Sequence, residues 1–101
     1  LQEQLNALQE FLDGLEEVNS APPNVTLSDG DTLTLHAGGR EIQVLSFGPA
    51  HTGGDLIVVL PTEGIICTGD FLTGGGPFLT DAYATGWVEA LEELKEVVSH
   101  Y

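Results

Sequence analysis

An apolar segment that turns back on itself is the feature that most constrains the fold of this chain. Residues 56–60 (Leu-Ile-Val-Val-Leu) are apolar at every position, which predicts a strand that is covered on both faces. Pro61 restricts its own φ and Gly64 tolerates unusual φ values, so residues 61–64 predict a hairpin turn. Residues 65–68 are then expected to return as the antiparallel partner strand.

The same hairpin is expected to bring polar side chains together at one edge of the sheet. An antiparallel register about the turn places Asp55 opposite Gly69 and Asp70, and the glycine-rich loop 48–54, which contains His51, enters from the same end. A histidine and carboxylates at strand ends are suitable ligands for zinc or another transition metal. Spacing alone leaves an alternative open, in which the two aspartates only accept hydrogen bonds from loop N–H groups.

Helices are predicted at both ends of the chain, with short strands between them. Residues 1–18 repeat leucine every three or four positions, which predicts a helix docked on a sheet, because about two and a half heptads is short for a coiled coil. The proline-containing segment 19–24 ends this helix. The segment 86–99 predicts a second helix, with Thr85 as its N-cap and Trp87 as a core anchor rather than a substrate contact. Strands are predicted, in addition to the hairpin, at 25–27, 33–37 and 41–47. The expected fold class is therefore α/β of the α+β type, with an antiparallel meander of about five strands between two helices.

The charge balance excludes several kinds of partner. The chain has 16 acidic residues and 2 basic ones, a net charge of −14, so nucleic acid and anionic membranes are not expected to bind. The acidity predicts a self-repelling, soluble chain, and adaptation to high salt is an alternative explanation of it. Cys67 is the only cysteine and is expected to be a small buried hydrophobic residue. No apolar run approaches the ~20 residues of a membrane span, and residues 1–18 carry acidic side chains where a signal peptide carries positive charge. A soluble chain in the cytoplasm is expected.

Residues 48–72 (GPAHTGGDLIVVLPTEGIICTGDFL) carry a family resemblance. They resemble the G-x-x-H-T-x-G-D, strand, turn, strand, T-G-D segment of the metallo-β-lactamase superfamily. The resemblance continues through the loop 74–80 and Trp87 into the helix that follows, and it covers nearly the whole chain. It implies that residues 1–101 form the C-terminal portion of an αββα sandwich, as a partial domain.

The resemblance also implies roles for individual residues. His51 would be the third histidine ligand of a first zinc ion, and Asp70 would be the carboxylate that bridges two zinc ions. The residues expected to orient these ligands are Thr52, Asp55 and Gly69. Apart from the resemblance, the glycine-rich loop beside these residues predicts a substrate-binding loop that contains Phe78 and Tyr83, with a mobile surface loop as the alternative. The implied activity is zinc-dependent hydrolysis of a small-molecule ester, thioester, lactone or amide.

The chain departs from the family pattern in its number of ligands. The H-x-H-x-D-H motif and the final Gly-His ligand of the family do not occur, and neither His36 nor His100 matches a family ligand. We therefore expect no catalytic residues that act in this chain alone, and association either with further copies or with a missing N-terminal half. The alternative function is a non-catalytic half-domain that self-associates or binds a partner. A cation-binding turn at residues 29–31 is a third, because it contains two aspartates, although it lacks the other ligands of a calcium loop.

Overall fold

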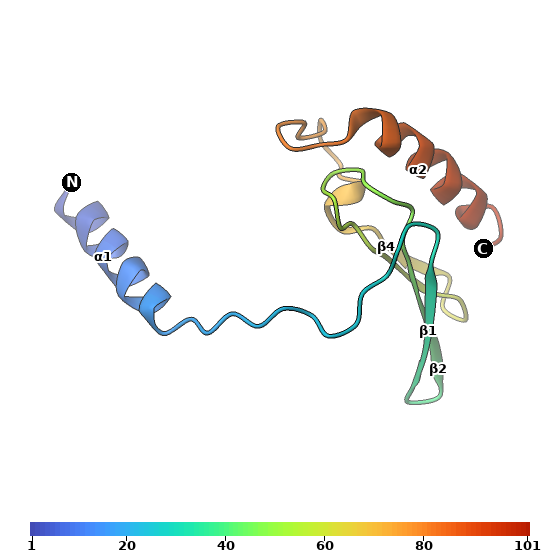
Figure 1. Ribbon diagram of the computed structural model, residues 1–101, viewed down its shortest axis with the longest axis horizontal. Coiled ribbons are helices and arrows are strands. Elements are labelled where there is room, and N and C mark those ends of the chain that lie inside the picture. Colours follow the sequence, from blue (N-terminus) through green and yellow to red (C-terminus); the bar gives the residue numbers. More distant parts are fainter.

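Two helices and one antiparallel sheet make up the computed structural model, which describes residues 1–101 (Figure 1). The α+β class and the helix at each end are confirmed. The sheet has four strands, not about five, because residues 25–27 pair with no other strand. The elements in chain order are α1 (Gln2–Glu16), β1 (Thr32–Ala37), β2 (Arg40–Leu45), β3 (Ile57–Leu60), β4 (Ile65–Cys67), the short 3-10 helix η1 (Gly69–Phe71) and α2 (Ala84–Val98).

The sheet is a meander in which neighbours in sequence are neighbours in space, in the order β1-β2-β3-β4. Strands β1 and β2 are joined by a two-residue turn at Gly38–Gly39, the loop length that favours a tight hairpin. Strands β3 and β4 pair with Leu60 opposite Ile65 and Val58 opposite Cys67. This register is the one predicted from the 61–64 turn.

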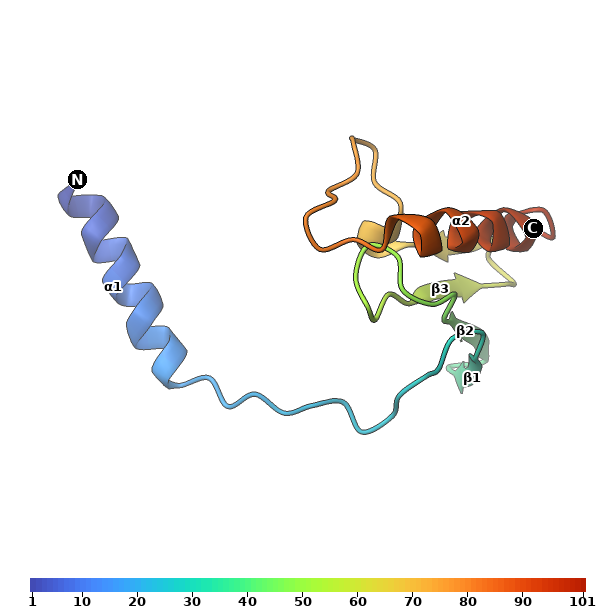
Figure 2. The same ribbon diagram turned by 45° about the horizontal axis from the view of Figure 1, so that its top comes forward.

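Helix α2 packs on one face of the sheet and forms the core with it (Figures 1 and 2). The buried apolar residues come from the sheet, from the segments that follow β2 and β4, and from α2: Leu45, Ala50, Ile57, Val59, Phe71, Trp87, Ala90 and Leu94. Trp87 is thus confirmed as a core anchor. The predicted N-cap is wrong by two residues, because Trp87 N–H already donates to the carbonyl of Tyr83, so Thr85 lies inside the first turn.

The opposite face of the sheet has no helix over it. Cross-strand pairing places one set of apolar side chains there, which we call the open sheet face: Leu33, Leu35, Ile42, Val44, Val58, Leu60, Ile65 and Cys67. The prediction that residues 56–60 are covered on both sides is therefore wrong, since only Ile57 and Val59, on the α2 side, are buried. Cys67 is exposed rather than buried for the same reason.

Helix α1 stands apart from the rest of the molecule in both views (Figures 1 and 2). It buries none of its residues, so the expected docking on a sheet is not seen. The segment 18–27, which has no regular secondary structure and includes Pro22 and Pro23, carries it away from the sheet. The radius of gyration is accordingly 17.8 Å, against roughly 13 Å for a compact domain of 100 residues. Neither helix of the structure has the length and apolar character that crossing a membrane requires.

Candidate functional site

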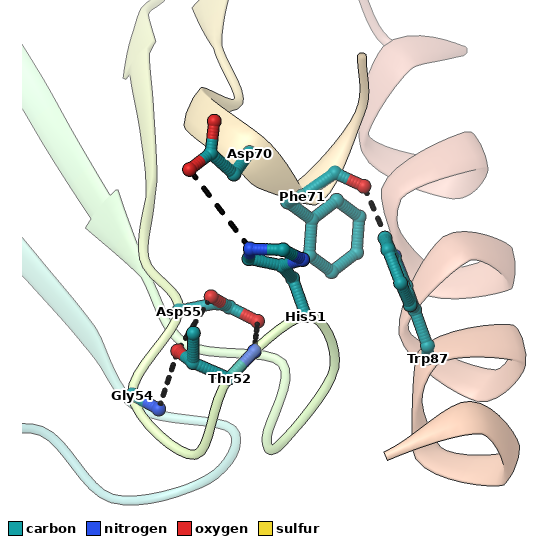
Figure 3. Close-up of polar contacts among 7 residues, drawn as sticks. All are labelled: His51, Thr52, Gly54, Asp55, Asp70, Phe71 and Trp87. Carbon is teal, nitrogen blue, oxygen red and sulfur yellow. Dashed lines mark hydrogen bonds and ion pairs between the residues drawn. The ribbon is translucent and has the colours of Figure 1, made fainter. Parts of the chain in front are cut away.

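His51 and Asp70 face each other where the loop before β3 meets the segment after β4 (Figure 3). His51 Nε2 lies 3.9 Å from Asp70 Oδ2. The histidine side chain is 19% exposed and the aspartate side chain 80% exposed, so the pair opens to solvent on the carboxylate side. A shallow hollow beside the pair is lined by His51, Asp70, Thr73, Gly76 and Phe78. The structure thus brings together the two residues that the resemblance implies as metal ligands, with Phe78 at the same hollow.

Hydrogen bonds that Thr52 donates to Asp55 fix the shape of the loop that carries His51 (Figure 3). The Asp55 carboxylate accepts from Thr52 twice, from the backbone N–H at 2.9 Å and from the hydroxyl at 2.8 Å. The Thr52 hydroxyl oxygen in turn accepts from the backbone N–H of Gly54 at 3.2 Å. Both carboxylate oxygens are therefore used within the loop, and Asp55 stabilises the turn next to His51 instead of pointing at Asp70.

The first turn of α2 holds the other side of this loop. The backbone N–H of Tyr83 donates to the carbonyl of Ala50 at 2.7 Å, and Ala50 is completely buried. The Pro49 carbonyl approaches Gly86 so closely that a Cβ at that position would lie 2.5 Å from the oxygen. Only glycine permits this contact without a shift of the helix or of the loop.

Trp87 contacts both of the segments that carry the pair (Figure 3). Its ring packs edge-on against His51 with the centroids 5.5 Å apart. Its indole Nε1–H donates to the carbonyl of Phe71, the residue after Asp70, at 3.0 Å. Trp87 therefore links the His51 loop to the segment that carries Asp70 and helps to set the distance between the two side chains. The sequence indicated a core tryptophan, but no spacing rule connected it with His51, because the contact joins segments that are far apart in the sequence.

The pair fits zinc as two ligands of a larger set. Imidazole nitrogen and carboxylate oxygen both bind zinc at ~2.0–2.2 Å, so two ligands of one tetrahedral ion lie roughly 3.3–3.6 Å apart. The observed 3.9 Å is slightly longer, so the two side chains must approach each other a little to share an ion. The other ring nitrogen of His51, Nδ1, is buried and makes no hydrogen bond, which leaves Nε2 as the nitrogen available at the hollow. Closed zinc sites use four protein ligands and catalytic sites three plus water. No group of three or more His, Cys, Asp or Glu side chains in the structure is placed to hold a metal ion.

The electrostatic surroundings of the pair favour cations. Arg40 pairs with Glu63 at 2.9 Å and Lys95 lies 4.0 Å from Glu92. Neither basic side chain lines the hollow. The net charge of −14 is thus not offset locally, and it raises the local concentration of cations rather than anions.

Gly69, Tyr83 and the turn at residues 29–31 are the other sites that the sequence suggested. Gly69 adopts a positive φ of 55° at the start of η1 and so sets the direction of Asp70. The Tyr83 side chain does not line the hollow; its hydroxyl lies behind the His51 loop, against Gly53. In the turn at 29–31, the Asp31 carboxylate accepts from the backbone N–H of Ser28 at 2.7 Å, which gives it a role in the turn.

Comparison with known proteins identifies no family: no protein-family model and no curated protein matches this sequence. The family resemblance therefore rests on the motif residues alone, and the function built on it is a proposal.

Proposed function

We propose that this chain supplies part of the active site of a zinc-dependent hydrolase that acts on an ester, thioester, lactone or amide. The observation that carries the proposal is the position of the His51–Asp70 pair. The two motif segments, which flank the β3–β4 hairpin, present an imidazole nitrogen and a carboxylate oxygen 3.9 Å apart at one hollow. These residue types suit two ligands of a zinc site, and a small approach of the two side chains would bring them to tetrahedral spacing.

In this proposal His51 binds zinc through Nε2 and Asp70 binds it through its carboxylate. Zinc in such a site lowers the pKa of a water molecule and polarises the carbonyl of a substrate. The other residues act by positioning. Asp55 holds the His51 loop through Thr52, and Trp87 shields one side of the imidazole from water. Interactions of this kind around the ligands are a general requirement of metal sites.

Two ligands do not hold a catalytic metal, so the proposal needs further ligands from a segment outside these 101 residues or from another chain. Residues 1–101 alone are accordingly expected to show no hydrolysis above background. A member of the same superfamily would supply those ligands from an H-x-H-x-D-H motif, in the half of the sandwich that covers the open sheet face.

Zinc titration of the metal-free chain by calorimetry tests the proposal. We expect weak binding that disappears in His51→Ala and in Asp70→Asn. The matched control is His36→Ala, which removes an exposed histidine on β1. Equal binding by all four proteins would contradict the assignment of the pair. Tight stoichiometric binding, or hydrolysis of a thioester by the chain with zinc alone, would contradict the need for further ligands.

A second candidate function is self-association without catalysis, which the uncovered apolar surfaces favour. On the open sheet face Leu35 is 45% and Ile65 47% exposed, and contiguous apolar surface of this kind marks interaction sites. Sedimentation velocity over a range of concentrations tests it. Leu35→Lys is expected to abolish dimers, whereas Val98→Lys, at an exposed position on α2, is expected to leave them intact. A wild-type chain that stays monomeric at all concentrations would exclude this function.

A further inference from the structure

An apolar groove lies between residues 71–79 and the first two turns of α2. It encloses about 350 Å³, and seven of its ten lining residues are hydrophobic. The main contributors are Phe71, Leu72, Leu79, Trp87, Val88 and Leu91, and none of the lining residues is charged. Leu72, Leu79 and Val88 are each more than half exposed. A ligand that covers them gains the free energy of removing apolar surface from water.

The groove adjoins the candidate site, and one residue lines both. Thr73 lines both the groove and the hollow beside His51 and Asp70. Phe71 follows Asp70 directly, and Trp87 is the groove residue whose ring packs edge-on against His51. A molecule with its reacting group at the pair therefore meets Phe78 in the hollow itself and has this groove as an adjoining apolar surface.

The net charge of the chain and the lining of the groove indicate what kind of ligand the groove can bind. The chain carries −14, so an anionic group is repelled as it approaches. The indole N–H of Trp87, the strongest side-chain donor in the wall, is already committed to the carbonyl of Phe71. The groove thus offers an uncharged apolar wall and few free hydrogen-bonding groups.

We propose that this groove binds an uncharged, apolar acyl or alkyl group of the substrate. The proposal rests on the proposed hydrolase function and narrows its substrate class to hydrophobic, neutral molecules. It assigns Trp87 and Val88 as groove-lining residues that contact this group.

The fluorescence of Trp87 tests the proposal directly, because it is the only tryptophan of the chain. Metal-free protein is titrated with butanamide, hexanamide and octanamide, which differ only in the length of the apolar group. We expect a saturable change in emission and an affinity that rises roughly threefold to fourfold for each added methylene. Octanoate, with the same apolar group and a negative charge, is expected to bind more weakly than octanamide.

Two valine variants on α2 locate the binding surface. Val88→Asn is expected to weaken octanamide binding roughly fivefold to tenfold, since it removes an apolar contact. The matched control, Val98→Asn, changes an exposed valine of the same helix outside the groove and is expected to leave the affinity unchanged. Amide NMR shifts induced by octanamide are expected at residues 71–79 and 84–91.

Several outcomes would overturn the proposal. These are no saturable emission change, no dependence on chain length, or equal weakening by both variants. A dimer that Val88→Asn dissociates, together with no octanamide binding, would instead make the groove an interface between copies. The assay contains no zinc and no reaction, so failure of the metal or hydrolase proposal leaves this result readable, and the reverse is also true.

Discussion

Replacement of Gly86 by alanine probes the contact that holds the His51 loop against α2. A Cβ at residue 86 would lie 2.5 Å from the carbonyl oxygen of Pro49. Relaxed carbon–oxygen contacts begin near roughly 3.3 Å, so the loop and the helix must move apart by roughly 0.8 Å. That movement also lengthens the bond from the backbone N–H of Tyr83 to the carbonyl of Ala50, now 2.7 Å.

Opposing effects decide the size of the change. Alanine is better than glycine inside a helix by about 1 kcal/mol. Overpacking against backbone costs about 1–3 kcal/mol, and weakening one hydrogen bond costs about 1 kcal/mol. We therefore expect Gly86→Ala to lower the free energy of unfolding by about 1–3 kcal/mol, with a fall in Tm of roughly 4–8 °C per kcal/mol.

Urea denaturation followed by Trp87 fluorescence measures this change, because the indole is packed in the core next to the altered contact. The matched control is Gly14→Ala, a helical glycine of α1 with no atom within 4 Å of the added methyl group. That variant is expected to raise helicity by circular dichroism and to leave the Trp87 transition unchanged. The reasoning is refuted if Gly86→Ala is as stable as the wild type with an unaltered Trp87 emission spectrum.

Three further predictions follow from the packing. Trp87→Phe keeps an aromatic ring but leaves the Phe71 carbonyl without its donor. We expect the free energy of unfolding, measured by thermal denaturation, to fall by about 1–3 kcal/mol and zinc uptake to weaken. An unchanged stability together with unchanged zinc uptake would show that this hydrogen bond does not matter. Ile57→Ala truncates a side chain that is 1% exposed and is expected to lower the free energy of unfolding by about 2–5 kcal/mol. Leu35→Ala, on the open sheet face, is expected to lower it by at most roughly 0.5 kcal/mol. Similar urea midpoints for the two variants would contradict the difference in burial between the two faces of the sheet. Deletion of residues 1–16 is expected to leave the urea midpoint of the Trp87 transition unchanged, because α1 buries no residue; a lower midpoint would mean that α1 packs on the sheet in solution.

The two candidate functions make different demands on the same surface. A hydrolase of the proposed kind needs the open sheet face covered by the part that brings the remaining ligands. A self-associating module needs the same face to meet its own copy. Zinc affinity and sedimentation therefore separate the two, since only the first function depends on His51 and Asp70.

Local patterns in the sequence determined the elements and one register. The three- and four-residue spacing of leucine predicted α1. Apolar runs and alternation predicted the four strands of the sheet to within one or two positions, but also a strand at 25–27 that does not form. The turn at 61–64 fixed the pairing of β3 with β4, because a short hairpin loop leaves only one register open. The same register placed Asp70 at the edge of the sheet where the His51 loop enters. Each of these features depends on residues within about twenty positions of one another.

Only the tertiary structure decided which surfaces are covered and what surrounds the pair. Residues 56–60 are apolar throughout, yet α2 covers one face and nothing in the chain covers the other. The leucines of α1 predicted a helix but not its distance from the sheet, which depends on the path of residues 17–31 (Figure 1). The contacts of Trp87 with His51 and Phe71 join segments separated by 36 and 16 residues. Such contacts depend on how elements pack in three dimensions, and no spacing along the sequence encodes them.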